Sequence, residues 1–140
     1  MLRVVIDPGV LIAALISAQG APRALLHAWI EGAFELLISP KLIAELEGVL
    51  ERDKFRQYVT VRDARAYVAI LRRFATMVPD AKLTTRLSPG PGDDYLIALA
   101  TAQATNALIS GDPHLTGLKN PAVPVLTPRA FLDRLEAGNK

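Results

Sequence analysis

The segment Val4-Val5-Ile6-Asp7-Pro8 sets the architecture that the rest of the chain follows. Its apolar residues lack the alternation of a half-exposed strand, which predicts a central strand covered on both faces, as in parallel sheets. The strand stops at the carboxylate of Asp7. In parallel α/β sheets ligands bind at the carboxyl ends of the strands, so an acid is presented where chemistry is expected.

The same pattern occurs four times along the chain. An apolar run is followed by a small polar residue and then by proline, at residues 4–8, 36–40, 107–113 and 123–128. Asp, Ser or Thr at the N-cap with Pro at the first helical position is a strong start signal for a helix. The repeated order of strand, cap and helix predicts an α/β fold with parallel strands.

Helical periodicity supplies the expected helices between and after these strands. We expect helices over residues 10–16, 22–32, 42–50, 60–77, 95–105 and 130–135, with a short helical turn over 114–118. The helix that opens at Thr60 should bury Tyr67, Leu71, Phe74 and Val78 on one face. Residues 95–105 are apolar nearly all round and should be buried.

Composition narrows the class of protein. The chain has 140 residues and 51% hydrophobic content, which suits one compact domain over residues 1–140. It has no cysteine, so thiolate metal sites, disulfides and cysteine nucleophiles are excluded. No signal peptide or membrane-spanning stretch is indicated, so we expect a cytoplasmic protein that does not bind membranes.

Charge is distributed unevenly along the chain. Residues 52–86 carry nine basic and three acidic side chains, a net of +6, and the remainder carries a net of −4. A basic arm beside an acidic body suits a phosphate-rich ligand that lies along the arm. Arg65, Arg72 and Arg73 are the candidate phosphate contacts, although a solvated helix face would give the same pattern.

Four acids are the candidate site residues. Asp7 and Asp112 follow strands, and Glu45 lies at the border of the apolar face of its helix. Asp93 opens a helix, and chain order alone leaves open which edge of the sheet it reaches. Helix capping is the alternative role for each Asp.

Four carboxylates in one site would repel one another unless a hard divalent cation held them together. The absence of cysteine and the scarcity of histidine therefore favour Mg²⁺ or Mn²⁺ and phosphoryl chemistry.

These residues carry a family resemblance. Val4-Val5-Ile6-Asp7, Ser39-Pro40 with Glu45, Pro91-Gly92-Asp93-Asp94-Tyr95 and Ile109-Ser110-Gly111-Asp112 stand in an order and at a spacing similar to those of the PIN domain family. More narrowly, the chain resembles the toxin components of toxin–antitoxin pairs.

The resemblance implies a three-layer α/β/α sandwich with a central parallel sheet. It also implies a metal-dependent ribonuclease, commonly dimeric and inhibited by a small antitoxin. Asp7, Glu45, Asp93 and Asp112 would share one acidic pocket, with Asp112 bound directly or through water. Cleavage would leave a 3′-hydroxyl and a 5′-phosphate, and Ser110 would orient water or a carboxylate.

The sequence departs from the family pattern at three places. Pro8 and Gly9 replace a small hydroxyl residue and an Asn, Gly90 replaces a further acid, and His114 replaces a second Asp. These departures keep open a catalytically silent module that holds RNA or a partner protein. A phosphatase with an aspartyl nucleophile is a more distant alternative, because the second Asp of its motif is Gly9.

Overall fold

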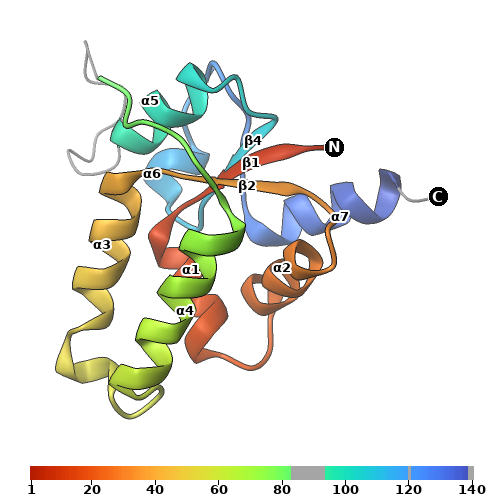
Figure 1. The fold of residues 1–140 in the computed structure, drawn as a ribbon. Helices are drawn as coiled ribbons and strands as arrows, with labels where there is room; N and C mark the ends of the chain where they lie inside the picture. The colour runs from red at the N-terminus through yellow and green to blue at the C-terminus, as the bar shows by residue number, and fades with distance from the viewer. Residues whose placement is uncertain (83–93, 120, 139–140) are drawn as a thin grey trace.

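The computed structural model describes residues 1–82, 94–119 and 121–138. Within them, five strands form one parallel sheet in the order β3-β2-β1-β4-β5 (Figure 1). The strands are β1 (Arg3–Ile6), β2 (Glu35–Ile38), β3 (Thr76–Met77), β4 (Ala107–Ile109) and β5 (Val125–Leu126). β1 is the central strand, and the fully buried Val4 and Val5 confirm that it is covered on both faces.

The predicted order of strand, cap and helix is confirmed at all four places. Each proline is the first residue of a helix: α1 (Pro8–Ile16), α3 (Pro40–Leu50), α6 (Pro113–Thr116) and α7 (Pro128–Gly138). The preceding side chains accept backbone N–H bonds, as Ser39 does from Leu42 and Thr127 from Ala130. A proline at this position has no N–H to leave unpaired, which makes each helix start at a defined residue.

Helices cover both faces of the sheet. Figure 1 shows α5 (Asp94–Ala102) on the opposite side of the sheet from α1 and α3. Two further helices, α2 (Ala21–Ile30) and α4 (Val61–Phe74), lie on the side of α1 and α3, where α2 packs on α1 and α4 on α3. The expected three-layer α/β/α sandwich with a central parallel sheet is confirmed. A 3-10 turn, η1 (Asp53–Phe55), lies between α3 and α4.

The end of α4 differs from the prediction. The helix stops at Phe74, Ala75 is extended, and Thr76–Met77 forms the edge strand β3, so a helix continuing to residue 77 was wrong. The reason is tertiary: β3 pairs with β2, and Val78 N–H continues the ladder by donating to Ile38 C=O at 2.8 Å. Pairing with a buried strand outweighs a helical pattern in a short segment.

The buried face of α4 is narrower than expected. Tyr67 and Leu71 are buried, and the Tyr67 hydroxyl donates to Leu11 C=O at 2.8 Å, tying α4 to α1. Phe74 is 66% exposed, so its predicted burial was wrong, because the helix ends there and the chain turns into β3.

The helix over residues 95–105 is confirmed in its burial but ends earlier. It runs over Asp94–Ala102, and Ala104, two residues after its end, has a positive φ of 48°. The proline and glycine turn expected over residues 88–92 lies outside the described residues.

The described chain has no single helix that is long and apolar enough to cross a membrane. Among the described helices, only the pair α1 and α2 reaches the necessary length and composition, and the two are bent by 94° at the break between them.

Candidate functional site

The candidate site lies at the carboxyl ends of β1 and β4. Ile6 pairs with Ile109, and Asp7 N–H continues the ladder by donating to Ile109 C=O at 2.9 Å. The first residue after β1 therefore stands beside Ser110, the first residue after β4. The strand that follows β1 in the chain is β2, and the strand that follows β4 is β5; along the sheet these two lie in opposite directions from the β1–β4 pair. Open α/β sheets bind ligands at such a reversal of strand order.

Both oxygens of Asp7 are fixed by hydrogen bonds. Oδ1 accepts from Gly9 N–H at 2.9 Å, and Oδ2 accepts from the Ser110 hydroxyl at 2.8 Å. Ser110 is fully buried, and its oxygen in turn accepts Asp112 N–H at 3.0 Å. One buried hydroxyl thus links the side chain of Asp7 to the backbone of Asp112.

Asp112 also has a capping role, as the alternative interpretation proposed. Its Oδ1 accepts His114 N–H at 2.9 Å at the start of α6, and His114 Nδ1 lies 3.8 Å from the same oxygen. Asp7 and Asp112 line an open hollow of about 390 Å³, together with Gly9 and Pro128. Asp7 and Asp112 therefore cap helices and line this hollow at the same time.

Glu45 approaches the site from α3. Its Oε2 accepts a hydrogen bond from the Tyr95 hydroxyl of α5 at 3.1 Å, and Lys41 Nζ lies 4.7 Å from the centre of the Tyr95 ring. Burial raises the pKa of Glu45, the Tyr95 hydrogen bond lowers it, the charge of Asp7 raises it, and Lys41 lowers it. Glu45 is exposed as a whole residue, so the desolvation concerns only part of its side chain.

The charge of Asp7 is one of the causes that raise the pKa of Glu45, so the two carboxylates repel each other. A hard divalent cation prefers oxygen ligands, and it relieves the repulsion between carboxylates. The chemistry of these donors therefore fits Mg²⁺ or Mn²⁺. Among the residues that the structure describes, no three Asp, Glu or His side chains form a group that would hold an ion. Asp93 lies outside those residues, so the four-acid pocket stays a prediction.

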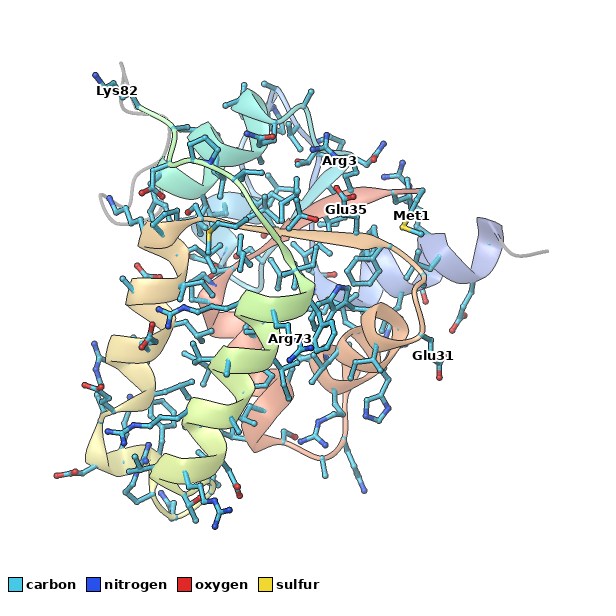
Figure 2. The ribbon with its side chains drawn as sticks, in the orientation of Figure 1. Met1, Arg3, Glu31, Glu35, Arg73 and Lys82 are labelled. Carbon is cyan, nitrogen blue, oxygen red and sulfur yellow. The ribbon has the colours of Figure 1, made fainter. Side chains whose placement is uncertain are left out.

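The three candidate phosphate contacts lie elsewhere. Arg65, Arg72 and Arg73 line a groove between α3 and α4, and Figure 2 shows Arg73 on α4. Arg72 is ion-paired with Glu47 of α3. Glu45 and Glu47 project from opposite flanks of α3, because residues two apart on a helix are about 200° apart.

The amino ends of the same strands have a structural role. Arg3 Nε donates to Glu35 Oε1 at 3.1 Å, and Figure 2 shows the two side chains together where β1 and β2 begin. Arg3 Nη1 also donates to Gln103 C=O at 2.9 Å. These bonds join the two strands to the end of α5, at the edge of the sheet opposite Asp7.

Sequence reasoning missed Tyr95 and Lys41 as neighbours of Glu45. Lys41 precedes Glu45 by four residues, a spacing that puts two helical side chains side by side and could have indicated the pair. Tyr95 follows Asp93 and Asp94 in the chain, but its contact with α3 depends on how α5 crosses the sheet, which no local pattern reveals.

Comparisons with known proteins agree with this architecture. The model of the PIN domain family matches residues 3–114. The fold is similar to that of VapBC2 from Rickettsia felis, solved bound to a DNA fragment from its promoter, with a TM-score of 0.62 and 13% identity over 89% of this chain and 97% of that one. It is also similar to PAE2754 from Pyrobaculum aerophilum, with a TM-score of 0.66 and 18% identity over 98% and 96% of the two chains. No curated protein matches the sequence.

Proposed function

Because this chain belongs to the PIN domain family, we propose that it is a metal-dependent endoribonuclease whose site is the carboxyl edge around Asp7. Asp7, Glu45, Asp93 and Asp112 would hold Mg²⁺ or Mn²⁺. The observation that carries the proposal is the placement of Asp7: a carboxylate held by two hydrogen bonds at the end of the central strand, lining the same open hollow as Asp112.

The residues around the carboxylates would orient them for metal binding. A bound divalent cation supplies activation of water and neutralisation of the scissile phosphate. Ser110 holds Asp7 in one orientation, so that little reorganisation is needed when the cation binds. Tyr95 does the same for Glu45 through its hydroxyl, and Lys41 contacts the ring of Tyr95. The products would be a 3′-hydroxyl and a 5′-phosphate.

We further propose that the protein is the toxin of a toxin–antitoxin pair, working as a homodimer and held inactive by a small antitoxin. The support is the fold likeness to the VapBC2 complex, which shows the architecture alone at 13% identity. A gene for a small protein directly beside this one would support the pairing, and co-purification of its product would test it.

The test of the nuclease is cleavage of a structured RNA pool by purified, folded protein in Mn²⁺, Mg²⁺ or EDTA. Cleavage should require the metal and should fall at least about a hundredfold in Asp7→Asn and Asp93→Asn. Asp133→Asn is the matched control, because Asp133 lies in α7 outside the candidate site. Equal cleavage by Asp7→Asn and Asp133→Asn would refute the proposed site.

The alternative function is a catalytically silent module that binds RNA or a partner. Gly9 favours it, because the side chain that the family resemblance places there is missing from the rim of the hollow. RNA binding that is independent of metal, without cleavage in any metal, would establish this alternative. Transfer of phosphate to Asp7 from a small phosphodonor would instead indicate the phosphatase.

A further inference from the structure

A lysine at the start of α3 lies at the same edge of the sheet as the candidate site. Lys41 is the second residue of α3, which begins directly after β2, and β2 runs parallel to β1 beside it. The side chain is exposed, and its Nζ lies 4.7 Å from the centre of the Tyr95 ring. Figure 1 shows the first turn of α3 next to α5, the helix that carries Tyr95. Lys41 therefore places a cation at the carboxyl edge.

The fold leaves the ammonium group of Lys41 unused. In the described part of the chain, this group forms neither a hydrogen bond nor an ion pair. Glu45 follows four residues later on the same helix, but the order of lysine before glutamate is the weaker one for such a pair. Only the backbone N–H of Lys41 is engaged, donating to Asp80 Oδ1 at 3.1 Å. Three N–H bonds of the ammonium group are therefore available to a ligand.

Helix stability does not account for a cation at this position. The amino end of a helix favours negative charge, and a lysine in the first turn opposes the helix dipole. The first turn of α3 has no acid of its own, and the carboxylate that its amino end favours comes from Asp80, outside the helix. An anionic ligand gives a reason for Lys41 that the helix itself does not.

The ring of Tyr95 connects this lysine to Glu45. Its hydroxyl donates to Glu45 Oε2 at 3.1 Å, while its face contacts the ammonium group of Lys41. Burial raises the pKa of Glu45, and the charge of Lys41 is among the causes that lower it. A cation–π contact also restrains a long flexible side chain, so less conformational entropy is lost when a ligand binds. One buried aromatic residue thus holds a carboxylate and a cation near each other.

A phosphate is the anion that this arrangement suits. RNA that approaches Asp7 and Glu45 brings negative charge toward carboxylates, and a fixed cation beside them offsets the repulsion. Lysine is a common phosphate ligand because its ammonium group acts as a compact point charge. The three candidate arginines line the groove between α3 and α4, on the flank of α3 opposite to Glu45, so they do not supply this charge.

We propose that Lys41, held against the ring of Tyr95, binds a non-bridging oxygen of the scissile phosphate of RNA. The inference rests on the proposed nuclease function and gives Lys41 a contact with the substrate, separate from the carboxylates that would hold metal. Its charge would stabilise the negative charge that develops on the phosphate during hydrolysis. Lys41 precedes the basic arm of residues 52–86, so counting charges along the chain did not indicate it.

The first test is the rate of RNA cleavage at saturating RNA and Mn²⁺. Lys41→Gln removes the charge and should cleave about tenfold more slowly or worse, whereas Lys41→Arg keeps the charge and should retain most of the rate. Arg134→Gln is the matched control, because Arg134 is exposed on α7, outside both the candidate site and the basic arm. It should cleave at the wild-type rate.

The second test measures binding in the Asp93→Asn background, in which the RNA should survive. The slope of log affinity against log salt concentration should become shallower by about 0.7 in Lys41→Gln, as expected for one lost phosphate contact. It should not change in Arg134→Gln. Titration of the single Lys41→Gln variant with Mn²⁺ should give an affinity equal to or higher than that of the wild type, because a cation beside the carboxylates has been removed.

Three outcomes would overturn the inference. An unchanged salt slope in Lys41→Gln would exclude a phosphate contact. A shallower slope with a wild-type cleavage rate would assign Lys41 to a neighbouring phosphate. A loss of Mn²⁺ affinity would make Lys41 a positioning residue that acts on Glu45 through Tyr95.

Failure of the proposed function looks different from failure of this inference. If the wild type cleaves no RNA in any metal, the nuclease is refuted, and the salt slope still reports whether Lys41 contacts phosphate. If the wild type cleaves RNA and Lys41→Gln matches Arg134→Gln in rate and slope, the nuclease stands and the inference about Lys41 falls. Unfolding curves of the variants exclude loss of fold as the cause.

Discussion

The hydroxyl of Tyr95 donates a hydrogen bond to Oε2 of Glu45 across 3.1 Å, and this bond joins α5 to α3 above the carboxyl edge of the sheet. Tyr95 is only 8% exposed, so its ring is fixed by packing and its hydroxyl is aimed. Lys41 stacks on the same ring. Glu45 of α3 is thereby oriented by Tyr95 of α5.

Replacing Tyr95 with Phe should weaken metal binding without unfolding the protein. The variant loses one hydrogen bond to a charged group, worth about 1.5–3 kcal/mol, so Mn²⁺ affinity should fall about tenfold or more. Titration calorimetry with Mn²⁺ measures this directly. Tyr58→Phe is the matched control, because Tyr58 is 58% exposed. Equal affinities of the two variants would show that Tyr95 does not orient Glu45.

The raised pKa of Glu45 predicts how stability depends on pH. Burial is its main cause, and the folded protein therefore holds this proton more tightly than the unfolded chain, whose Glu has its usual pKa of 4.5. The stabilising contribution is complete below pH 4.5 and is lost as pH rises through the folded pKa.

Urea unfolding of wild type and Glu45→Gln, from below pH 4.5 to above the folded pKa of Glu45, tests the predicted direction of the pH dependence. Wild type should lose stability relative to Glu45→Gln as pH rises, since the glutamine does not titrate. Saturating Mn²⁺ should reverse the trend, because a metal binds the ionised carboxylate. Parallel stability curves without metal would contradict the assignment of the raised pKa.

Ser110→Ala should reduce both stability and cleavage. It removes the donor to Asp7 and leaves the N–H of Asp112 without its acceptor, at a cost of about 1–3 kcal/mol. Ser39→Ala provides the comparison, because Ser39 is an equally buried hydroxyl that caps α3, worth about 1 kcal/mol. Thermal unfolding and RNA cleavage should separate the two: both variants lose stability, and Ser110→Ala loses far more activity. A similar activity loss in both would mean that the hydroxyl of Ser110 only supports the fold.

Most of the fold was predictable because its signals are local. A buried apolar run, a capping side chain and a proline lie within a few residues of one another, so Ser39-Pro40 and Thr127-Pro128 mark element boundaries without any tertiary information. The strand Thr76–Met77 has no such signal. It is two residues long, continues a helical pattern, and exists because β2 has an edge to pair with.

Only part of the geometry of the candidate site was predictable, and the four-acid pocket stays a prediction. Asp7 and Asp112 follow strands, so their shared edge follows from the parallel sheet. Two further features depend on how the helices cross. These are the contact of Glu45 with Tyr95 and the placement of Arg65 of α4 beside the flank of α3 opposite to Glu45. Charge counting placed the arginines in a basic arm beside the acidic body, but the direction in which they face depends on the packing of α4 on α3.

Gly9 provides a test of whether the departures from the family pattern limit activity. A Cβ added at Gly9 would meet its nearest neighbour, Asp7 Oδ1, at 3.6 Å, which is an ordinary contact. Gly9→Ala should therefore be tolerated in the first turn of α1 and should stabilise the fold by about 0.5–1 kcal/mol. Gly9→Asn should be tolerated equally and should place an amide beside Asp7 at the rim of the hollow.

The two Gly9 variants separate rigidity from chemistry. Both remove the flexibility of glycine, and only Gly9→Asn adds a polar group that can orient water or a ligand at Asp7. If the missing Asn limits metal binding, Mn²⁺ affinity should rise in Gly9→Asn and stay at the wild-type value in Gly9→Ala. Equal affinities would mean that the loss of this side chain is already compensated in the native site, and the silent-module alternative would then lose the support of Gly9.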